Sequence, residues 1–564
     1  MKHGHIKAWL CKLLMYGAAG SGKTTSKEII IGNKPPKDRV STPLAMRPTT
    51  VYRVNLEGKE WAKLTTLEER KLFFARVLIN VAPDLVDRLL ATQSGDATTS
   101  TNEPISTVAE PQVRSKDQAS SDLSKPPTFT NDQSPLAITE SNLFQPLESF
   151  SSDEASETEV LQSVTTDEEL VKLMGQLSTT VDPVAAFRLL HIIDSGGQPQ
   201  FHEILPIFLR RLDFYVFVFR LCDELTCHPV VEFYIDGKPV GTPFTSAQTI
   251  EQLLQHCARS MHSHRSSSGS EGECPRIMIL GTHLDKAKKS KEIRKKKNKS
   301  ILKVLLPTLE DQIIYHNIPT NEVIFPLNAL NPGRHEQDII KQIREVLLGE
   351  SSIPAADIPL RWFALEILLE EMTKVLQRGV LSRQECFTTA VDKLHFEDDA
   401  EFDAAIQYLD DLSVLLHYPS ILPGVVFADP QVLLDKVTEL VLASFKMNIL
   451  SENKALSDEW RKYYCFALVT VEFLSLEDFS RHYVPGLFEA KHLVQLFKTL
   501  LIFAKISDTQ SFVPALLRDL SSKDVDKYRV LSNPALALHF PDGGPRKGIF
   551  CSLLCWLVSP ENDG

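Results

Sequence analysis

The residues with the clearest chemical meaning follow an apolar run over residues 9–16, and they are Gly17, Ala18, Ala19, Gly20, Ser21, Gly22, Lys23 and Thr24. Their spacing, G-x-x-x-x-G-K-[ST], lets backbone N–H groups curl around phosphate oxygens. Lys23 can then reach the β- and γ-phosphates, while the Thr24 hydroxyl can bind Mg²⁺. Thr25 and the residues after it indicate a helix, whose N-terminus adds partial positive charge. The pattern predicts a site for the phosphates of a nucleoside triphosphate.

A second motif begins where another apolar run, over residues 187–193, ends in Asp194. A carboxylate at a strand tip can hold Mg²⁺ through water, and the sequence continues Ser-Gly-Gly197-Gln198. The backbone N–H of Gly197 can detect the γ-phosphate, and the Gln198 side chain can orient the attacking water. We therefore predict Asp194 as a metal residue and Gln198 as the catalytic residue.

The loop over residues 35–50 lies between the phosphate motif and the next strand, which we expect over residues 51–56. P-loop enzymes keep a threonine in this loop that senses the γ-phosphate through Mg²⁺. Thr42 and Thr49 are both candidates. We favour Thr49 as the metal residue because it is closer to the strand.

A third motif follows the apolar run over residues 276–280, where the chain continues Gly-Thr282-His283-Leu-Asp285-Lys286. The Asp285 carboxylate can accept hydrogen bonds from the ring N–H and exocyclic amine of guanine, which adenine cannot supply. A later strand, expected over residues 323–327, delivers backbone groups that can support the guanine oxygen. The predicted base-binding residues are Thr282, His283, Asp285, Lys286, Asn328 and Ala329.

The elements that must position these motifs are strands alternating with helices. The runs over residues 214–219 and 276–280 are continuously apolar, which is typical of strands in a parallel sheet covered on both faces. The strand over 51–56 alternates and is expected at a sheet edge. Helical spacing over 66–91, broken at Pro83, and a short helix near 166–177 complete an α/β pattern.

Composition sets the limits of the organisation. A chain of 564 residues has room for about three or four domains. We predict no membrane span, since no window reaches ~18 uncharged apolar residues. Nine cysteines without a C-x-x-C pair indicate reduced thiols and a cytoplasmic protein. Residues 91–165 hold twelve Asp/Glu against three Lys/Arg and are rich in Ser and Thr, so we expect a disordered insertion.

The second half of the chain predicts a different unit. Five features follow one another along it: helical spacing over 358–376, a capping box at Ser382 and Glu385, a helix over 401–412, a hairpin around Gly424 and a helix after Asp429. This order is that of a winged helix. The acidic helix would repel nucleic-acid phosphates, and we interpret the basic run over 286–299 as a solvated helix face, so no nucleic-acid partner is expected.

With these motifs in this order, the sequence resembles the Ras-like GTPases, and more narrowly the Roc domain of the Roco family. The common guanine motif N-K-x-D is here T-H-L-D, ending in Asp285, a form found in Roc domains. Gln198 stands where Ras-like enzymes keep a water-positioning glutamine. Residues 358–367 and 427–431 resemble the COR domain that follows Roc.

The resemblance implies a P-loop Ras-like GTPase domain over residues 1–350, with a mostly parallel sheet between helices, interrupted by the insertion 91–165. An α+β COR region follows, with a winged-helix-like first half over 351–450 and a second half over 451–564 that we expect to be truncated. The resemblance also implies that the chain binds GTP or GDP with Mg²⁺ and hydrolyses GTP slowly. It implies that COR transmits the nucleotide state and forms a homodimer.

Two other classes of function stay open. A non-catalytic signalling scaffold would bind nucleotide and dock partners without hydrolysis. An ATP-driven signalling P-loop ATPase is disfavoured, because Asp194 is not followed by a second acidic residue and Asp285 has no role with adenine.

Overall fold

The computed structural model describes the following residues, and all structural statements concern them: 5–36, 41–42, 44–46, 48–54, 62–81, 186–209, 212–235, 238–246, 248–263, 275–287, 291–347, 356–450, 463, 467–516, 553 and 555–556. The predicted insertion and the helix near 166–177 lie outside them. None of the described helices combines the length and apolar character that crossing a membrane requires.

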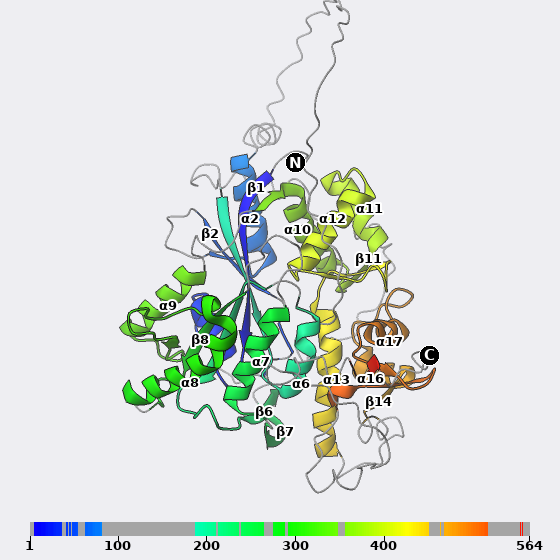
Figure 1. Ribbon diagram of the computed structural model, residues 1–564. Coiled ribbons are helices and arrows are strands. Elements are labelled where there is room, and N and C mark those ends of the chain that lie inside the picture. The colour runs from blue at the N-terminus through cyan, green and yellow to red at the C-terminus, as the bar shows by residue number, and fades with distance from the viewer. Residues whose placement is uncertain are drawn as a thin grey trace, which may run out of the picture.

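The centre of the fold is one sheet in the order β3-β2-β4-β1-β5-β8-β9 (Figure 1). Its strands are β1 (His5–Tyr16), β2 (Thr49–Val54), β3 (Ala62–Lys63), β4 (Ala186–Asp194), β5 (Phe214–Arg220), β8 (Arg276–Thr282) and β9 (Ile324–Pro326). The pairs β1–β4, β1–β5, β5–β8 and β8–β9 are parallel, and β2 runs antiparallel to β4 and β3. The predicted α/β class with a mostly parallel sheet is confirmed at this level.

Helices cover both faces of this sheet. They are α1 (Lys23–Ile30), α2 (Leu67–Val81), α6 (Pro199–Ile204), α7 (Ile250–Ser263), α8 (Lys291–Leu309) and α9 (Arg334–Leu347). Alternate side chains of β5 enter two separate cores, as the twofold period of a strand requires. Tyr215 and Phe217 pack with α6, α7 and α8 on one face, whereas Val216 and Val218 pack with α1 and α9 on the other.

Two details of the sheet differ from prediction. β2 is not the edge strand, because β3 pairs with it through residues 62–63 and ends the sheet. Residues 358 and 359 were expected at the start of a helix, yet they belong to β10 (Ala356–Pro359), which runs antiparallel to the beginning of β1. The residue before a proline is biased toward extended backbone, so Ile358-Pro359 carried a signal for this strand.

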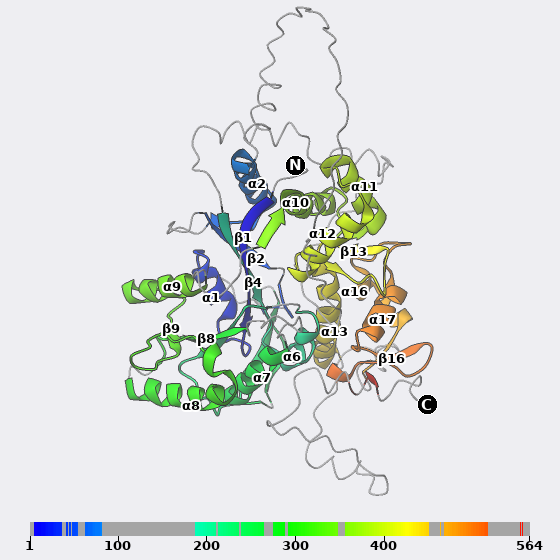
Figure 2. The same ribbon diagram turned by 45° about the horizontal axis from the view of Figure 1, so that its top comes forward.

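A second group of elements lies beside the sheet, and Figures 1 and 2 show it on the same side of β1 in both views. It consists of α10 (Leu360–Val375), β11 (Val380–Ser382), α11 (Arg383–Leu394), α12 (Asp399–Asp411), β12 (Leu416–His417), β13 (Val425–Phe427) and α13 (Gln431–Leu450). The three strands form an antiparallel sheet, β11-β13-β12. The expected succession of helices and hairpin is therefore present, while the domain boundaries stay predictions.

Local signals explain where these helices begin. The Ser382 hydroxyl accepts from the Glu385 backbone N–H (3.0 Å), and the Glu385 carboxylate accepts from the Ser382 N–H (2.7 Å). This is the predicted capping box, which satisfies two otherwise unpaired donors of α11. At α13, the Asp429 carboxylate accepts from the Gln431 N–H (3.0 Å).

The remaining elements complete the described chain. They are β6 (Val230–Ile235) and β7 (Lys238–Thr245), then β14 (Leu468–Thr470), α15 (Val471–Leu474), α16 (Glu477–Ser480), α17 (Ala490–Thr499), β15 (Ala504–Lys505) and β16 (Gln510–Phe512), with short 3₁₀ turns at Leu205–Ile207, Glu310–Gln312 and Pro514–Leu516. The first two strands form a separate antiparallel hairpin. The last three strands form a small sheet, β14-β16-β15.

Buried ion pairs join α2 to α10. The Arg70 guanidinium lies 3.0 Å from the Glu366 carboxylate and 2.5 Å from that of Glu370. Lys71 lies 2.9 Å from Glu371. Removing one partner of such a buried pair leaves an uncompensated charge, so these contacts fix how the two helices meet.

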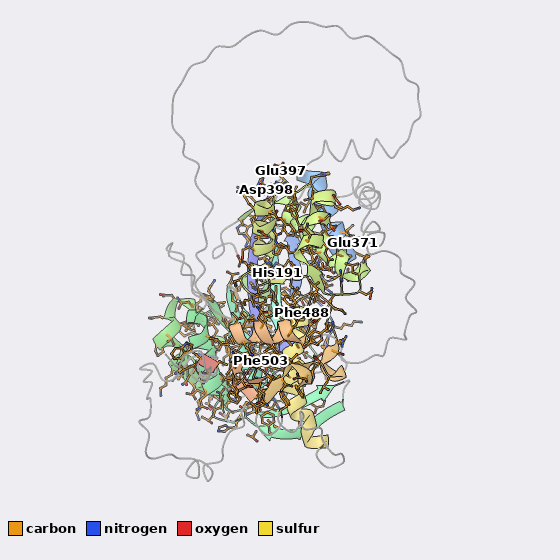
Figure 3. The ribbon with its side chains drawn as sticks, turned by 90° about the vertical axis from the view of Figure 1, so that its right-hand side faces the viewer. His191, Glu371, Glu397, Asp398, Phe488 and Phe503 are labelled. Carbon is orange, nitrogen blue, oxygen red and sulfur yellow. The ribbon has the colours of Figure 1, made fainter. Side chains whose placement is uncertain are left out.

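His191 of β4 gives the fold a predictable response to acid. Its ring lies within the body of the molecule (Figure 3) and is 2 % exposed, with Nδ1 3.0 Å from the Thr50 hydroxyl. Burial, aided by the charges of Lys12 and Arg70, lowers the His191 pKa to about 3. An unfolded histidine titrates near 6.5, so below that pH only the unfolded chain takes up this proton, and stability falls toward pH 3.

We expect this histidine to remove about 2 kcal/mol of the free energy of unfolding between pH 7.5 and 5.0, at about 1.4 kcal/mol per pH unit below 6.5. His191→Gln should lose correspondingly less stability on acidification, which urea denaturation at the two pH values measures. His335→Gln, at an exposed position on α9, is the matched control and should keep the wild-type pH dependence. An equal acid loss in His191→Gln and wild type would contradict the assignment.

Candidate functional site

The phosphate motif forms a tight turn between β1 and α1. Gly17, Gly20 and Gly22 have φ values of 148°, 69° and 91°. These lie in the region that favours glycine over residues with a Cβ. At Gly17 space is also missing, since a Cβ would lie 2.1 Å from the Val218 carbonyl oxygen. The glycines are therefore needed for the chain to turn at this point and start α1.

Lys23 lies over this turn. Its Nζ donates to the carbonyls of Gly17 (2.8 Å) and Ala18 (2.9 Å), and its side chain is buried. Burial lowers the Lys23 pKa to about 8, although the charge of Asp194 acts in the opposite direction. A cation desolvated in this way interacts strongly with any anion that enters.

Asp194 lies at the end of β4 and is 0 % exposed. Neither of its carboxylate oxygens has a hydrogen-bond partner in the described part of the chain. Burial raises the Asp194 pKa, against the opposing effects of Lys27, Thr24 and Lys23. An unpaired buried carboxylate is costly, and a hard cation with oxygen ligands would relieve that cost. The residues here thus fit Mg²⁺.

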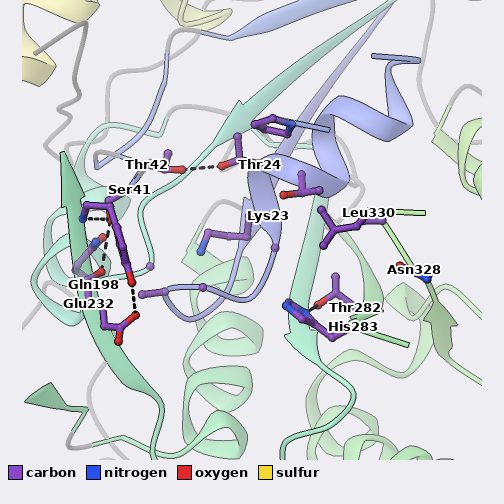
Figure 4. Close-up of a pocket in the computed structure, with 18 of the residues that line it drawn as sticks. Lys23, Thr24, Ser41, Thr42, Gln198, Glu232, Thr282, His283, Asn328 and Leu330 are labelled. Atoms are coloured by element: carbon purple, nitrogen blue, oxygen red, sulfur yellow. Dashed lines mark hydrogen bonds between the residues drawn. The ribbon is translucent and has the colours of Figure 1, made fainter. Parts of the chain in front are cut away.

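The Thr24 hydroxyl, the other predicted Mg²⁺ ligand, lies 2.7 Å from the hydroxyl of Thr42 (Figure 4). Thr49, which we favoured from the sequence, lies in β2 opposite Ile192, and its hydroxyl is 3.5 Å from Lys27 Nζ. Of the two candidate threonines, the structure therefore brings Thr42 and not Thr49 to Thr24. Closeness to the strand along the chain therefore does not predict which threonine contacts Thr24.

The loop that carries Thr42 is tied to the Asp194 motif by backbone hydrogen bonds. The Met46 N–H donates to the Asp194 carbonyl (2.8 Å), and the Gly196 N–H donates to the Leu44 carbonyl (2.8 Å). Further along, the Gly197 carbonyl accepts from the Ala19 N–H (3.1 Å). A Cβ on Gly197 would lie 2.2 Å from the Ala19 nitrogen, so this close approach requires glycine.

Gln198 follows at the start of α6. Its side chain is 2 % exposed, and among the described residues its Oε1 atom has no hydrogen-bond partner. A buried amide oxygen without a partner is an acceptor that a bound water can satisfy.

The predicted base-reading residues lie at the ends of β8 and β9. The Thr282 hydroxyl donates to the Ser21 carbonyl (2.6 Å), which joins this motif to the phosphate turn. It also lies 2.9 Å from Nδ1 of His283, whose pKa is lowered, chiefly by burial. Asp285 is exposed. The Thr282 hydroxyl thus helps to position the phosphate turn.

One cavity of about 380 Å³ connects these motifs. The predicted residues that line it are Ala19, Gly20, Gly22, Lys23, Thr24, Thr25, Thr42, Gly197, Gln198, Thr282, His283, Asp285, Asn328 and Ala329. The predicted residues that do not line it are Gly17, Ala18, Ser21, Thr49, Asp194 and Lys286. Gly17, Ala18 and Ser21 belong to the turn itself. Lys286 is exposed, and its backbone N–H donates to the His283 carbonyl.

Five lining residues were not predicted: Pro36, Ser41, Glu232, Tyr234 and Leu330. Glu232 and Tyr234 come from the β6–β7 hairpin. The sequence did contain a signal for it, since Asp236-Gly237 between two β-rich runs is a strong indication of a two-residue hairpin turn.

Comparison with known proteins finds likeness among solved structures. The sequence matches no protein-family model, and it matches no curated protein. Among solved structures, the chain is similar to Roco2 RocCORdC of Methanosarcina barkeri, determined with GDP bound. The two share 12 % identity with a TM-score of 0.40, over 91 % of this chain and 98 % of that one.

Proposed function

We propose that the cavity is the nucleotide site of a P-loop hydrolase. Within that class we assign the chain as a GTP-binding switch of the Roco type, which hydrolyses GTP slowly to GDP. The observation that supports this most is the single cavity lined by the phosphate turn, Gln198 and Asp285, with the unpartnered Asp194 carboxylate next to it.

The proposed binding roles follow the order of these residues. The N–H groups of the phosphate turn and Lys23 bind the phosphates, and Asp285 with the backbone of Ala329 binds guanine. Thr24, Asp194 and Thr42 would hold Mg²⁺. When bound, Mg²⁺ would offset negative charge on the β- and γ-phosphates.

The proposed chemistry is attack of water on the γ-phosphorus. Gln198 Oε1 accepts a hydrogen bond from the water and orients it. The bond between the γ-phosphorus and the bridging oxygen breaks, and GDP leaves with the electron pair. The Gly197 N–H detects the γ-phosphate.

A route for the nucleotide state to the second half of the chain begins at the Thr42 loop. The Leu44 N–H in this loop contacts the Thr438 hydroxyl of α13 at 3.5 Å. If Thr42 orders this loop when nucleotide binds, the change would therefore reach α13 through the Leu44 contact. We propose that the COR-like region transmits this change and forms a homodimer in the cytoplasm.

Calorimetry on the full chain with GDP and with ADP, each with Mg²⁺, tests the proposal. We expect guanine to be preferred by at least about 100-fold, because adenine offers no donors to the Asp285 carboxylate. Lys23→Ala is the control for site occupancy and should weaken binding of both nucleotides. Equal affinity for ADP and GDP would overturn the base assignment.

A further inference from the structure

The β6–β7 hairpin places an acidic side chain on the cavity wall. Glu232 and Tyr234 both line the cavity, and both lie on β6. Their side chains lie on the same side of the strand, since the Tyr234 hydroxyl contacts the Glu232 carboxylate, although the pairing of β6 with β7 is irregular between Val231 and Phe233. The hairpin therefore contributes a carboxylate and a phenol to the site.

Hydrogen bonds place this hairpin at the γ-phosphate end of the cavity. The Ser41 N–H donates to the Tyr234 carbonyl (3.1 Å), and the Tyr234 N–H donates to the Ser41 hydroxyl (2.9 Å). Ser41 directly precedes Thr42, whose hydroxyl lies 2.7 Å from that of Thr24. Glu232 is thus anchored next to the residues assigned to Mg²⁺.

Figure 4 shows the same arrangement around Lys23. Ser41, Glu232 and Gln198 lie together on one side of the lysine. The base-reading residues Thr282 and His283 lie on the other side of it. The carboxylate therefore faces the end at which hydrolysis is proposed, away from the purine.

The Glu232 side chain is held in place. The Tyr234 hydroxyl donates to Glu232 Oε2 at 3.0 Å, and the carboxylate is half-buried. Gln198 lines the same cavity, and its Oε1 atom is buried without a hydrogen-bond partner in the described structure. A water has two protons to donate, and these two side chains supply two acceptors for it.

We propose that Glu232 is a second catalytic residue, which holds the attacking water together with Gln198 and accepts its proton. This inference rests on the proposed GTP hydrolysis. As the water oxygen bonds to the γ-phosphorus, the bond to the bridging oxygen breaks and GDP leaves with the electron pair. The water proton passes to the Glu232 carboxylate and from there to the released phosphate.

Single-turnover GTP hydrolysis by Glu232→Gln tests this role. The amide keeps the size of the side chain but is a much weaker base, so we expect the rate constant to fall at least about tenfold. The dissociation constants of GTP and GDP should stay within about twofold, which separates a role in the chemical step from one in binding. An unchanged rate constant would overturn the proposal. So would tighter GTP binding with unchanged hydrolysis, which would instead mean that the carboxylate only repels the triphosphate.

Two further variants sharpen the result. Tyr234→Phe keeps the carboxylate but removes the donor that orients it, so we expect a smaller, severalfold fall in the rate constant. Glu251→Gln, on α7 away from the cavity lining, makes the same charge change and should hydrolyse GTP as wild type does. Failure of the wild-type chain to bind or hydrolyse GTP would overturn the proposed function as well, whereas a normal Glu232→Gln rate would overturn the role of Glu232 alone.

Discussion

Asp285→Asn is expected to move the preference of the cavity from guanosine to xanthosine nucleotides. The carboxylate of Asp285 would accept two hydrogen bonds from guanine, one from the ring N–H and one from the exocyclic amine. An asparagine amide offers one of these positions a donor in place of an acceptor, which suits the 2-oxo group of xanthine. Hydrogen bonds to a charged group contribute about 1.5–3 kcal/mol each, so GDP should bind about 100-fold more weakly.

Calorimetry with GDP and with xanthosine diphosphate measures this change in both directions. The variant should bind the xanthosine nucleotide more tightly than GDP, and the wild type should show the reverse order. Asp311→Asn is the matched control, because it makes the same change at an exposed residue that does not line the cavity. An unchanged affinity of Asp285→Asn for GDP would remove the basis for guanine recognition.

The parallel strands could be predicted because each buried strand is a continuous apolar run in the sequence. A run such as residues 214–219 is apolar at every position, and in β5 it supplies side chains to the cores on both faces of the sheet. The place of β2 in the sheet and the pairing of β10 with β1 could not be obtained in this way. Both depend on pairing with distant strands, β3 and β1, and such register is not encoded in either segment alone.

The same distinction divides the residues of the site. The phosphate turn and the motif around Asp285 are contiguous, so their spacing alone predicted them. The choice between Thr42 and Thr49 depends on how one loop folds back onto Thr24, a contact between separate segments. Glu232 enters the cavity only because the β6–β7 hairpin pairs with Ser41. A search for sequence motifs cannot detect that pairing.

Gln198→Leu is expected to separate a hydrolase from a scaffold that merely holds nucleotide. Leucine has a similar volume but no acceptor, so water would lose the amide oxygen that orients it. We expect the single-turnover rate constant for GTP to fall about 100-fold, which is the order of loss when a reacting group is no longer held in position. The affinity for GTP should change little, because this interaction forms with the water and not with the nucleotide.

The stability of the variant serves as its control. Since Gln198 Oε1 has no hydrogen-bond partner among the described residues, leucine breaks no bond at that atom, and the buried position tolerates an apolar side chain. The urea midpoint of Gln198→Leu should therefore equal or exceed that of the wild type. If both proteins bind GTP but hydrolyse it equally slowly, the nucleotide is held without being consumed. The cavity would then belong to a scaffold, and Glu232 would have no water to deprotonate.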